Sequence, residues 1–495
     1  MAKDVIVVVQ RDALPNEKES LDILIVSTTG KCPVETYRSV EAVNTVFGPD
    51  GSSPNAKVVR KATTLLNQGK TTLADTLVNK FKIVGFEPTS ASPATAATFV
   101  CTFADGALTE EIQSGNTLWV RVGGNDKALV EVTASKKIGT GSDLATLFDG
   151  TSFTFGGTTY TAAVSGATVT YTATTPGSAD TIPGRADIFE DEQLSTASSV
   201  PAPEAKFVNG KDAKSAADNL VEEIKRFQAD VDNDWYYLLT DKDDDEYVTA
   251  LAKFAEASEP SEAELGAGVE DHRKFYMGQT SNKKFASITA RAAVIYTDAE
   301  YLNEEADASY TGNVAPFYPN SVTWKFKRPQ DGNAPTSAGT KLITLPKLTE
   351  DERDQLLESH VNFLTEEYKH QYVKNGTCLN GEFIDVVLGG DWIAKRMRDL
   401  LYDILLSNDN VNYDDAGFGL ISTAVMQALA EAVDLNIIAR DPESNSGVYT
   451  VTVPKYEEST EDQRRSRIMP DITWEALLSG AIHQVKTKGV LRATL

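Results

Sequence analysis

Cysteine and long apolar runs are both scarce in this chain of 495 residues. Its three cysteines, Cys32, Cys101 and Cys378, lie far apart and form no CxxC pair. This spacing provides no disulfide framework, and we expect the chain to fold in a reducing, cytosolic compartment. The apolar run at residues 5–9 is too short for the core of a signal peptide. No stretch approaches the length of a membrane span, so we expect no membrane insertion.

Residues with catalytic or metal-binding spacing are lacking too. The four histidines are His272, His360, His370 and His483, and none belongs to an HExxH motif. The sequence has no GxSxG motif and no GxGxxG after a strand. We therefore expect no catalytic residue, no metal and no cofactor, and we predict that the chain is not an enzyme.

Two short segments resemble ligand-binding loops but lack a required residue. Gln68–Thr72 ends like a phosphate-binding loop, yet the glycine needed five residues before Gly69 is Thr64. We interpret this segment as the end of a helix. Asp241–Glu246 resembles a calcium loop, yet its sixth position is glutamate where glycine is needed. We interpret it as a solvated turn before a helix, with weak cation binding as the alternative.

Positive charge is in deficit. The chain has 47 Lys and Arg against 72 Asp and Glu, which gives a net charge of −25 at pH 7. A protein that follows a phosphate backbone needs clustered cations, so we expect no nucleic acid partner. The composition is that of a globular protein, with 41% apolar and 24% charged residues. The length predicts two to four domains.

Strand and helix patterns alternate along most of the chain. Leu21–Thr28 is an apolar run typical of a buried strand, and Trp235–Thr240 is another predicted strand. Ser39 as N-cap and Gly48 as the end predict a helix between them. The spacing also predicts one helix over Glu350–Tyr368. This alternation predicts an α/β (α+β) core of mixed sheet flanked by helices.

The composition changes at residue 89. From there to about 199 the chain is rich in Thr, Ser, Ala and Gly, with short alternating runs, which predicts a small β-rich domain inserted into the core. We expect an N-terminal strand and arm (1–20), the first part of the core (21–88), the inserted outer domain (89–200), the continued core (201–340), a C-terminal core (341–454), and a linker with the C-terminal strand (455–495).

Both ends of the chain have strand patterns. Val485–Thr494 partly alternates apolar or β-branched residues with basic ones, and Asp4–Gln10 is a β-branched run. These extended strands either pair within their own sheet or complete the sheet of a neighbouring subunit. The candidate intersubunit residues are Val5, Ile6, Val7, Val8, Val9, Val485, Thr487, Val490, Leu491 and Arg492.

The C-terminal third resembles a known family. The run Gly381–Trp392 (GEFIDVVLGGDW) and Tyr413–Gly417 (YDDAG) are similar to segments of the contractile tail sheath proteins of myovirus-type bacteriophages. The early segment Tyr37–Val43, followed by Phe47-Gly48, and the mid-chain Tyr310–Phe326 resemble the same family. The resemblance covers roughly 1–86 and 205–495. A phage and a phage tail-like bacteriocin would carry similar sheaths, and this choice stays open.

The resemblance implies a structural role and a set of partners. Sheath subunits stack as hexameric rings in a helical polymer around a tail tube protein, and contraction drives the tube through the host envelope for genome ejection. The resemblance implies that each subunit lends its terminal strands to neighbours. It also implies baseplate and tail terminator proteins as partners, assembly in the host bacterial cytoplasm, and residence in the virion.

Three basic residues are candidates for contact with the tube. Lys395, Arg396 and Arg398 cluster in an otherwise acidic chain and would suit an acidic tube surface. Alternatively, they form the solvated side of an amphipathic helix and pair with neighbouring acids. A different function also stays open: a virion surface protein that binds a receptor or glycan through the β-rich domain at 89–199.

Overall fold

The computed structural model describes residues 23–30, 32–48, 55–68, 81–103, 111–112, 114, 117–122, 125–131, 136–137, 139–155, 157–177, 187–190, 204–261, 263, 272–317, 321–333 and 341–485. The chain divides into two compact units. The larger is formed by Met1–Thr89 with Leu220–Leu495, and the smaller by Ser90–Asn219.

A mixed eight-stranded sheet forms the centre of the larger unit, in the order β18-β17-β16-β15-β14-β1-β3-β2. The six central strands are parallel, and the two edge strands, β2 and β18, are antiparallel to their neighbours. The mixed α/β content predicted from the sequence is confirmed. The strands are β1 (Ile23–Ser27), β2 (Cys32–Tyr37), β3 (Phe81–Gly85), β14 (Tyr237–Thr240), β15 (Phe275–Thr280), β16 (Ala292–Tyr296), β17 (Asn362–Glu367) and β18 (His370–Lys374).

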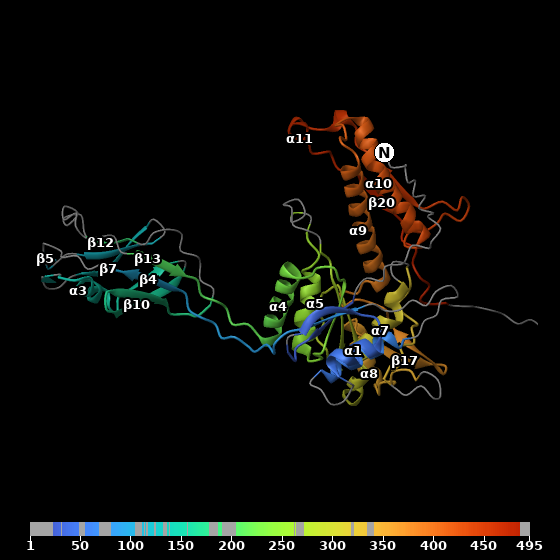
Figure 1. Ribbon diagram of the computed structural model, residues 1–495, viewed down its shortest axis with the longest axis horizontal. Helices are drawn as coiled ribbons and strands as arrows, with labels where there is room; N and C mark the ends of the chain where they lie inside the picture. The colour runs from blue at the N-terminus through green and yellow to red at the C-terminus, as the bar shows by residue number, and fades with distance from the viewer. Residues whose placement is uncertain are drawn as a thin grey trace, which may run out of the picture. The chain divides into compact units, whose positions relative to one another are not determined.

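Helices cover both faces of this sheet (Figure 1). Every residue of β1, β3, β14, β15 and β16 is buried, as parallel strands require when helices lie on both sides. One apolar layer contains residues of α1 (Val40–Phe47), α2 (Ala56–Leu66), α7 (Ala306–Val314) and the start of α9 (Ile384–Ser407). The other contains residues of α4 (Ala216–Asp230), α5 (Asp245–Glu256) and α8 (Glu350–Glu358).

The order of the strands reverses at one place in the sheet. From β1 the chain crosses to β3 on one side, whereas β14, β15, β16 and β17 follow one another on the other side. The reversal lies between β1 and β14, and this is a topological switch point. Two short 3-10 helices, η2 (Ala299–Glu304) and η3 (Ala315–Phe317), flank α7 near this region.

The helix predicted over Glu350–Tyr368 is wrong in its second half. α8 ends at Glu358, and residues 362–367 are β17. His360 has a positive φ of 56°, which ends the helix, and Asn362 then donates side-chain hydrogen bonds to the carbonyls of Val294 and Thr377. The apolar residues Val361, Phe363 and Leu364 are therefore buried at the sheet, where a period of two places Val361 and Phe363 in one apolar layer and Leu364 in the other.

A second, smaller apolar core lies at the C-terminal end of the larger unit. α9 begins against the sheet with Ile384 and Leu388 and continues into this second core with Ile393, Met397 and Leu400. There it packs against α10 (Asp415–Asp434) and the antiparallel ribbon β19–β20 (Tyr449–Thr452 and Thr473–Ala476). The connection between the two strands of the ribbon holds η4 (Tyr456–Glu458) and α11 (Glu461–Ser466).

α10 bears on the expectation that no stretch of the chain approaches a membrane span. Within the described part of the chain, it is the helix whose length and composition would suffice to cross a membrane, with a mean hydropathy of 1.4. Half of that stretch is buried inside the structure, where Ala424, Val425, Ala428 and Leu429 pack in the second core. The expectation that no stretch approaches a membrane span is thus corrected, because α10 meets the requirement by length and composition.

The smaller unit is built mainly of short antiparallel strands. Its five-stranded sheet has the order β13-β4-β11-β10-β9 and packs over a core rich in aromatic rings, including Phe99, Phe153 and Tyr171. The chain leaves this unit later than the boundary predicted at 200, because Glu204–Val208 (β13) pairs with β4. The elements are β4 (Thr98–Thr102), β5 (Glu111–Ile112), β6 (Thr117–Val122), β7 (Asn125–Glu131), β8 (Lys136–Lys137), α3 (Gly141–Ala145), η1 (Thr146–Phe148), β9 (Ser152–Phe155), β10 (Thr158–Ser165), β11 (Thr168–Ala173), β12 (Asp187–Glu190) and β13.

Candidate functional site

The switch point between β1 and β14 is the first place to examine, because open α/β sheets bind ligands at such a crevice. Here the two strand ends are hydrogen bonded to each other. The backbone N–H of Thr28 donates to Asp241 Oδ2 over 2.9 Å, and its hydroxyl donates to Asp241 Oδ1 over 3.1 Å. Asp241 is 9% exposed and lies directly after β14. Thr28 and Asp241 therefore bond to each other across the crevice and close it.

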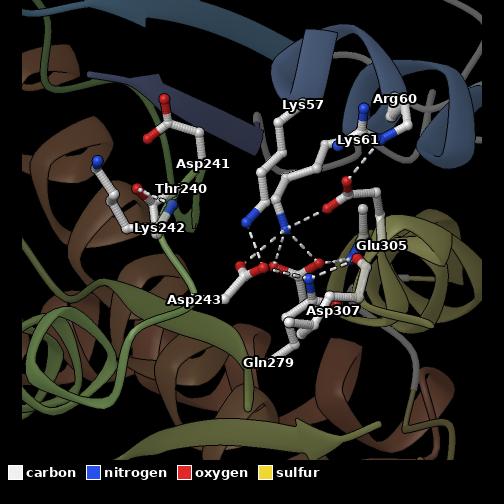
Figure 2. Close-up of polar contacts among 12 residues, drawn as sticks. Lys57, Arg60, Lys61, Thr240, Asp241, Lys242, Asp243, Gln279, Glu305 and Asp307 are labelled. Carbon is white, nitrogen blue, oxygen red and sulfur yellow. Dashed lines mark hydrogen bonds and ion pairs between the residues drawn. The ribbon is translucent and has the colours of Figure 1, made fainter. Parts of the chain in front are cut away.

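A buried ion network lies beside Asp241 (Figure 2). Lys57, Arg60 and Lys61 share one face of α2, because residues three and four apart are neighbours on a helix. Lys61 is fully buried, and its Nζ lies 2.5 Å from Asp307 Oδ2 and 3.1 Å from Glu305 Oε2. The same Nζ is 3.9 Å from Asp243 Oδ1.

The remaining residues of this ion network balance its positive and negative charges. Lys57 pairs with Asp243, which also accepts a hydrogen bond of 2.8 Å from Gln279 Nε2. Arg60 Nε donates to Glu305 Oε1 over 3.0 Å. Three cations thus face the three carboxylates of Asp243, Glu305 and Asp307. This neutral network joins α2 to the loop after β14 and to the start of α7.

The charges in this network support one another. Burial alone would lower the pKa of Lys61, but Asp307, Glu305 and Asp243 around it raise that pKa above its ordinary value, so the ammonium stays charged. Burial raises the pKa of Glu305, and Lys61 opposes the shift. The network is suited to holding elements together, since breaking a buried ion pair leaves an uncompensated charge.

The structure changes the interpretation of both loop-like segments. Asp241 and Asp243 point into the protein, so the prediction of a solvated turn over 241–246 is wrong for these two acids. Among the described residues, no group of three or more His, Cys, Asp or Glu is placed to hold a metal ion. Gln68 follows α2 and donates to the carbonyls of Thr64 and Gln330, while residues 69–80 lie outside the described part.

A second buried network ties α9 to the sheet. Asp391, 7% exposed, accepts hydrogen bonds from Tyr236 and Arg291, and Arg273 Nη1 lies 3.2 Å from its Oδ1. These partners precede β14, β15 and β16, so one carboxylate contacts the starts of three parallel strands. Burial raises the pKa of Asp391, whereas Arg291 beside it acts in the opposite direction. Asp391 lies within the Gly381–Trp392 run, but no pattern in the sequence singles it out.

The predicted intersubunit strands fall mostly outside the described residues. This holds for Val5, Ile6, Val7, Val8 and Val9, and equally for Thr487, Val490, Leu491 and Arg492. Val485 is the last described residue; it lies outside regular secondary structure and is 74% exposed. The partners of these strands stay a prediction.

The three basic residues of α9 separate into two groups. Arg396 turns toward α10, where its Nε and Nη2 donate to the two carboxylate oxygens of Glu431 over 2.6 and 2.9 Å. Lys395 is exposed and Arg398 is partly exposed. Lys395, Arg398 and Tyr402 follow one another at helical spacing along the other side of α9. Contact with a tube stays a prediction, and Arg396 is engaged by Glu431.

The C-terminal part of the larger unit exposes much apolar surface. Most of the exposed large hydrophobic side chains among the described residues lie after residue 400, and side chains of this kind mark an interaction site where they form a contiguous patch. Those after residue 400 are Tyr402, Leu405, Leu406, Leu420, Met426, Tyr456, Ile468, Trp474, Leu477, Leu478, Ile482 and Val485. Leu406 and Ile482, at 81% and 77% exposed, are the least covered of them.

The β19–β20 ribbon lies within this surface. Among the described residues, β19 and β20 pair as strands only with each other. The flanking residues Gly447 and Leu478 form isolated bridges to Arg440 and Ile438, and beyond these bridges no other strand pairs with the ribbon in the described part of the chain. An unpaired strand edge is a template for another strand. Trp474 on β20 is 40% exposed. The ribbon therefore combines unpaired backbone groups with exposed apolar side chains, which a structural assembly protein can use.

Comparisons with known proteins give similarities of low degree. No family model and no curated protein matches the chain. Solved structures that resemble it include a chain of the anti-feeding prophage baseplate, at 14% identity and TM-score 0.39, covering 56% of this chain and 73% of that one. They also include the sheath tail proteins of Desulfitobacterium hafniense and Listeria innocua, both at 11% identity and TM-score 0.39. The match to the Desulfitobacterium hafniense protein covers 87% of this chain and 90% of that protein's chain. The match to the Listeria innocua protein covers 93% of this chain and 96% of that protein's chain. Likenesses with this TM-score do not establish a shared fold.

Proposed function

We propose that this chain is a structural subunit of a contractile tail sheath, which polymerises as stacked rings around a tube and contracts to drive it through the host envelope. The observation that carries the proposal is the open-edged β19–β20 ribbon within an exposed apolar surface, in a chain whose C-terminal end has the pattern of a strand. The Gly381–Trp392 and Tyr413–Gly417 resemblance gives this assembly surface its particular role.

Strand addition is the proposed link between subunits. Residues 486–495 contain Lys486, Lys488 and Arg492 and no acidic residue. Asp471 lies just before β20 and Glu475 lies on it, so a basic strand that adds beside β20 would meet these two carboxylates. A strand of this length adds about five backbone hydrogen bonds at roughly 0.5–1.5 kcal/mol each. Each fully buried side chain such as Leu491 adds roughly 1.5–3 kcal/mol.

The tube contact is proposed for the exposed side of α9. Lys395 and Arg398 would face acidic groups of a tube, with Tyr402 and Leu405 supplying apolar contact on the same side. Arg396 holds α10 through Glu431 instead. Baseplate and tail terminator proteins are the partners proposed for the ends of the polymer, and the virion is the proposed location.

The role is proposed to be mechanical and not enzymatic. The two buried networks join helices to the sheet, and they suit a subunit that moves as a rigid body. Asp391 connects α9 to three strand ends, so force applied to the C-terminal surface would pass directly into the core. Hinging would then occur in the segments that lead to the terminal strands.

Cross-linking between two differently tagged chains tests the strand link. Both chains carry Cys32→Ser, because Cys101 and Cys378 are buried whereas Cys32 is partly exposed. One chain then carries Arg492→Cys and the other Glu475→Cys. Strand addition predicts a disulfide-linked heterodimer on mixing, and none when Glu475→Cys is replaced by Lys369→Cys in the exposed hairpin turn. Equal cross-linking of both pairs, or of neither, would overturn the proposal.

A further inference from the structure

The segment through which the chain approaches residue 486 is hydrogen bonded to Ile437 and Ala439 through the backbone of Ser479 and Leu477, and beyond Ser479 one half-buried side chain holds it against the body of the protein. This exit segment, Leu477–Val485, exposes Leu477, Ile482 and Val485 by 59%, 77% and 74%. Among Ala481–Val485, only His483 is not exposed. The position of residues 481–485 therefore depends on how His483 is held.

His483 lies in a clasp formed by two separate parts of the chain. Its Nε2 is 2.9 Å from Thr323 Oγ1, and Lys325 Nζ donates to its backbone carbonyl over 3.1 Å. The ring of Phe383 stands nearly perpendicular to the imidazole at 4.6 Å between centroids, and that of Phe326 does so at 6.3 Å. The imidazole is thus held edge-to-face between two aromatic rings with one polar partner.

A small cavity adjoins this clasp. It measures about 70 Å³ and is lined on one side by Phe383, Asp385 and Ile437. Residues 478–481 and His483 of the exit segment form the other wall. The segment therefore lies over α9 with space beneath it, and releasing the imidazole breaks no packed core.

The charges that face His483 come from both elements of the clasp. Lys325 and Lys327 lie in the segment 321–333, which is hydrogen bonded to β18, and Asp385 lies at the start of α9, where Lys327 acts on it. Burial lowers the pKa of His483, Lys325 lowers it further, and Asp385 raises it. A second positive charge beside Lys325 in this half-buried place is unfavourable.

We propose that His483 positions the end of the exit segment, which leads to the predicted C-terminal strand: its neutral imidazole holds residues 480–485 against the body, and its protonation releases them. This inference rests on the proposed function, because the strand is the part donated to a neighbour. It predicts that assembly of the polymer depends on pH, which strand pairing alone does not require.

The sign of the effect follows from the lowered pKa. A histidine whose folded pKa lies below its ordinary value of about 6.5 contributes fully to docking above that pH. The contribution is lost as the pH falls through the lowered pKa. The exit segment is therefore docked at neutral pH and released under mildly acidic conditions.

The docking can be measured on the full chain at concentrations too low for polymerisation. A fluorophore insensitive to pH is attached at Gln484→Cys in a Cys32→Ser background, and its anisotropy is followed from pH 7.5 to 4.5. We expect high anisotropy at neutral pH and a fall toward that of a free peptide below pH 6.5. With His483→Gln added, the fall disappears. A label at Lys369→Cys serves as the control and stays constant.

Two further variants separate electrostatics from a merely structural role. Lys325→Gln removes a charge that disfavours protonation of docked His483, so acid releases the segment less readily and the midpoint of the anisotropy change moves to lower pH. Asp385→Asn removes a charge that favours protonation of docked His483, so the midpoint moves to higher pH. Anisotropy of the parent chain that does not change with pH, or midpoints that both variants leave in place, would overturn the inference. Because these measurements need no polymer, absence of polymerisation at every pH contradicts the proposed function alone.

Discussion

At the scale of single residues, Lys61 carries the largest energetic consequence. Its ammonium is fully buried between Asp307 and Glu305, which have no solvent to compensate them if it is removed. We predict that Lys61→Met lowers the free energy of unfolding by roughly 3–5 kcal/mol. Urea unfolding followed by far-UV circular dichroism measures this.

The matched control is an exposed lysine in an ion pair. Lys225 is 53% exposed and pairs with Glu222 three residues earlier on α4. Lys225→Met should change the free energy of unfolding by about 0–0.5 kcal/mol, because solvent replaces the lost partner. Equal effects of the two substitutions would show that the buried network does not act as described.

The pair between Arg396 and Glu431 predicts a dependence of stability on pH. The hydrogen bond from Arg396 lowers the pKa of Glu431 below its ordinary value of 4.5. Its stabilisation is therefore present above pH 4.5 and is lost as the pH falls through the lowered pKa. The difference in Tm between the parent chain and Arg396→Gln should shrink on going from pH 6 to pH 3. Both side chains are about one third exposed, so the difference corresponds to less than about 1 kcal/mol.

The sequence showed which charged residues stand out, but it did not show what surrounds them in the fold. The spacing of basic residues on α9 was visible, but the partner of Arg396 lies 35 positions away on another helix. Asp241 and Asp243 were noticed as an acidic run, and their burial was missed. Their place directly after a predicted strand was the available signal, since strand ends of parallel sheets meet at one edge.

At the scale of elements, the turn before α10 depends on a glycine. A side chain at Gly417 would place its Cβ 1.8 Å from the carbonyl oxygen of Asn412. Gly417 also donates its N–H to Asp414 Oδ1, which caps the helix over 2.9 Å. We predict that Gly417→Ala destabilises the protein by roughly 1–3 kcal/mol, because backbone must move.

Gly419, two residues further along the same helix, gives the control. Nothing lies within 4 Å of a Cβ added there, so Gly419→Ala should stabilise α10 by about 0.5–1 kcal/mol through the reduced entropy of the unfolded chain. Differential scanning calorimetry should show that Tm falls for Gly417→Ala and rises for Gly419→Ala. A rise in Tm for Gly417→Ala would contradict the close approach to Asn412.

Elements with strong local signals could be predicted from the sequence. Ser39 caps α1 and Gly48 ends it, as the pattern predicts. Local sequence signals did not predict the secondary structure of segments whose conformation depends on tertiary contacts. The segment at 362–367 pairs as β17 because Asn362 and the buried apolar side chains fit the sheet. α7 is buried on all sides although it contains Asp307, Ser309, Thr311 and Asn313, and no amphipathic pattern marks such a helix.

At the scale of the whole molecule, the mixed α/β content could be predicted, and the arrangement of the sheet could not. Alternating apolar strands and amphipathic helices predict helices around a sheet, but strand order depends on crossovers that sequence patterns do not specify. The switch point between β1 and β14, and the networks beside it, therefore emerge only from the structure. The proposed assembly depends on the ends of the chain, where the sequence pattern is the available evidence.

Deletion of residues 486–495 tests the central proposal most directly. Electron microscopy and sedimentation of the full chain at high concentration should show tubes, rings or open helical polymers. The truncated chain should keep the same circular dichroism spectrum and remain a monomer, because the described core residues of the larger unit all precede residue 486. Unchanged polymerisation of the truncated chain would contradict strand donation, and a full chain that stays strictly monomeric would contradict the sheath role itself.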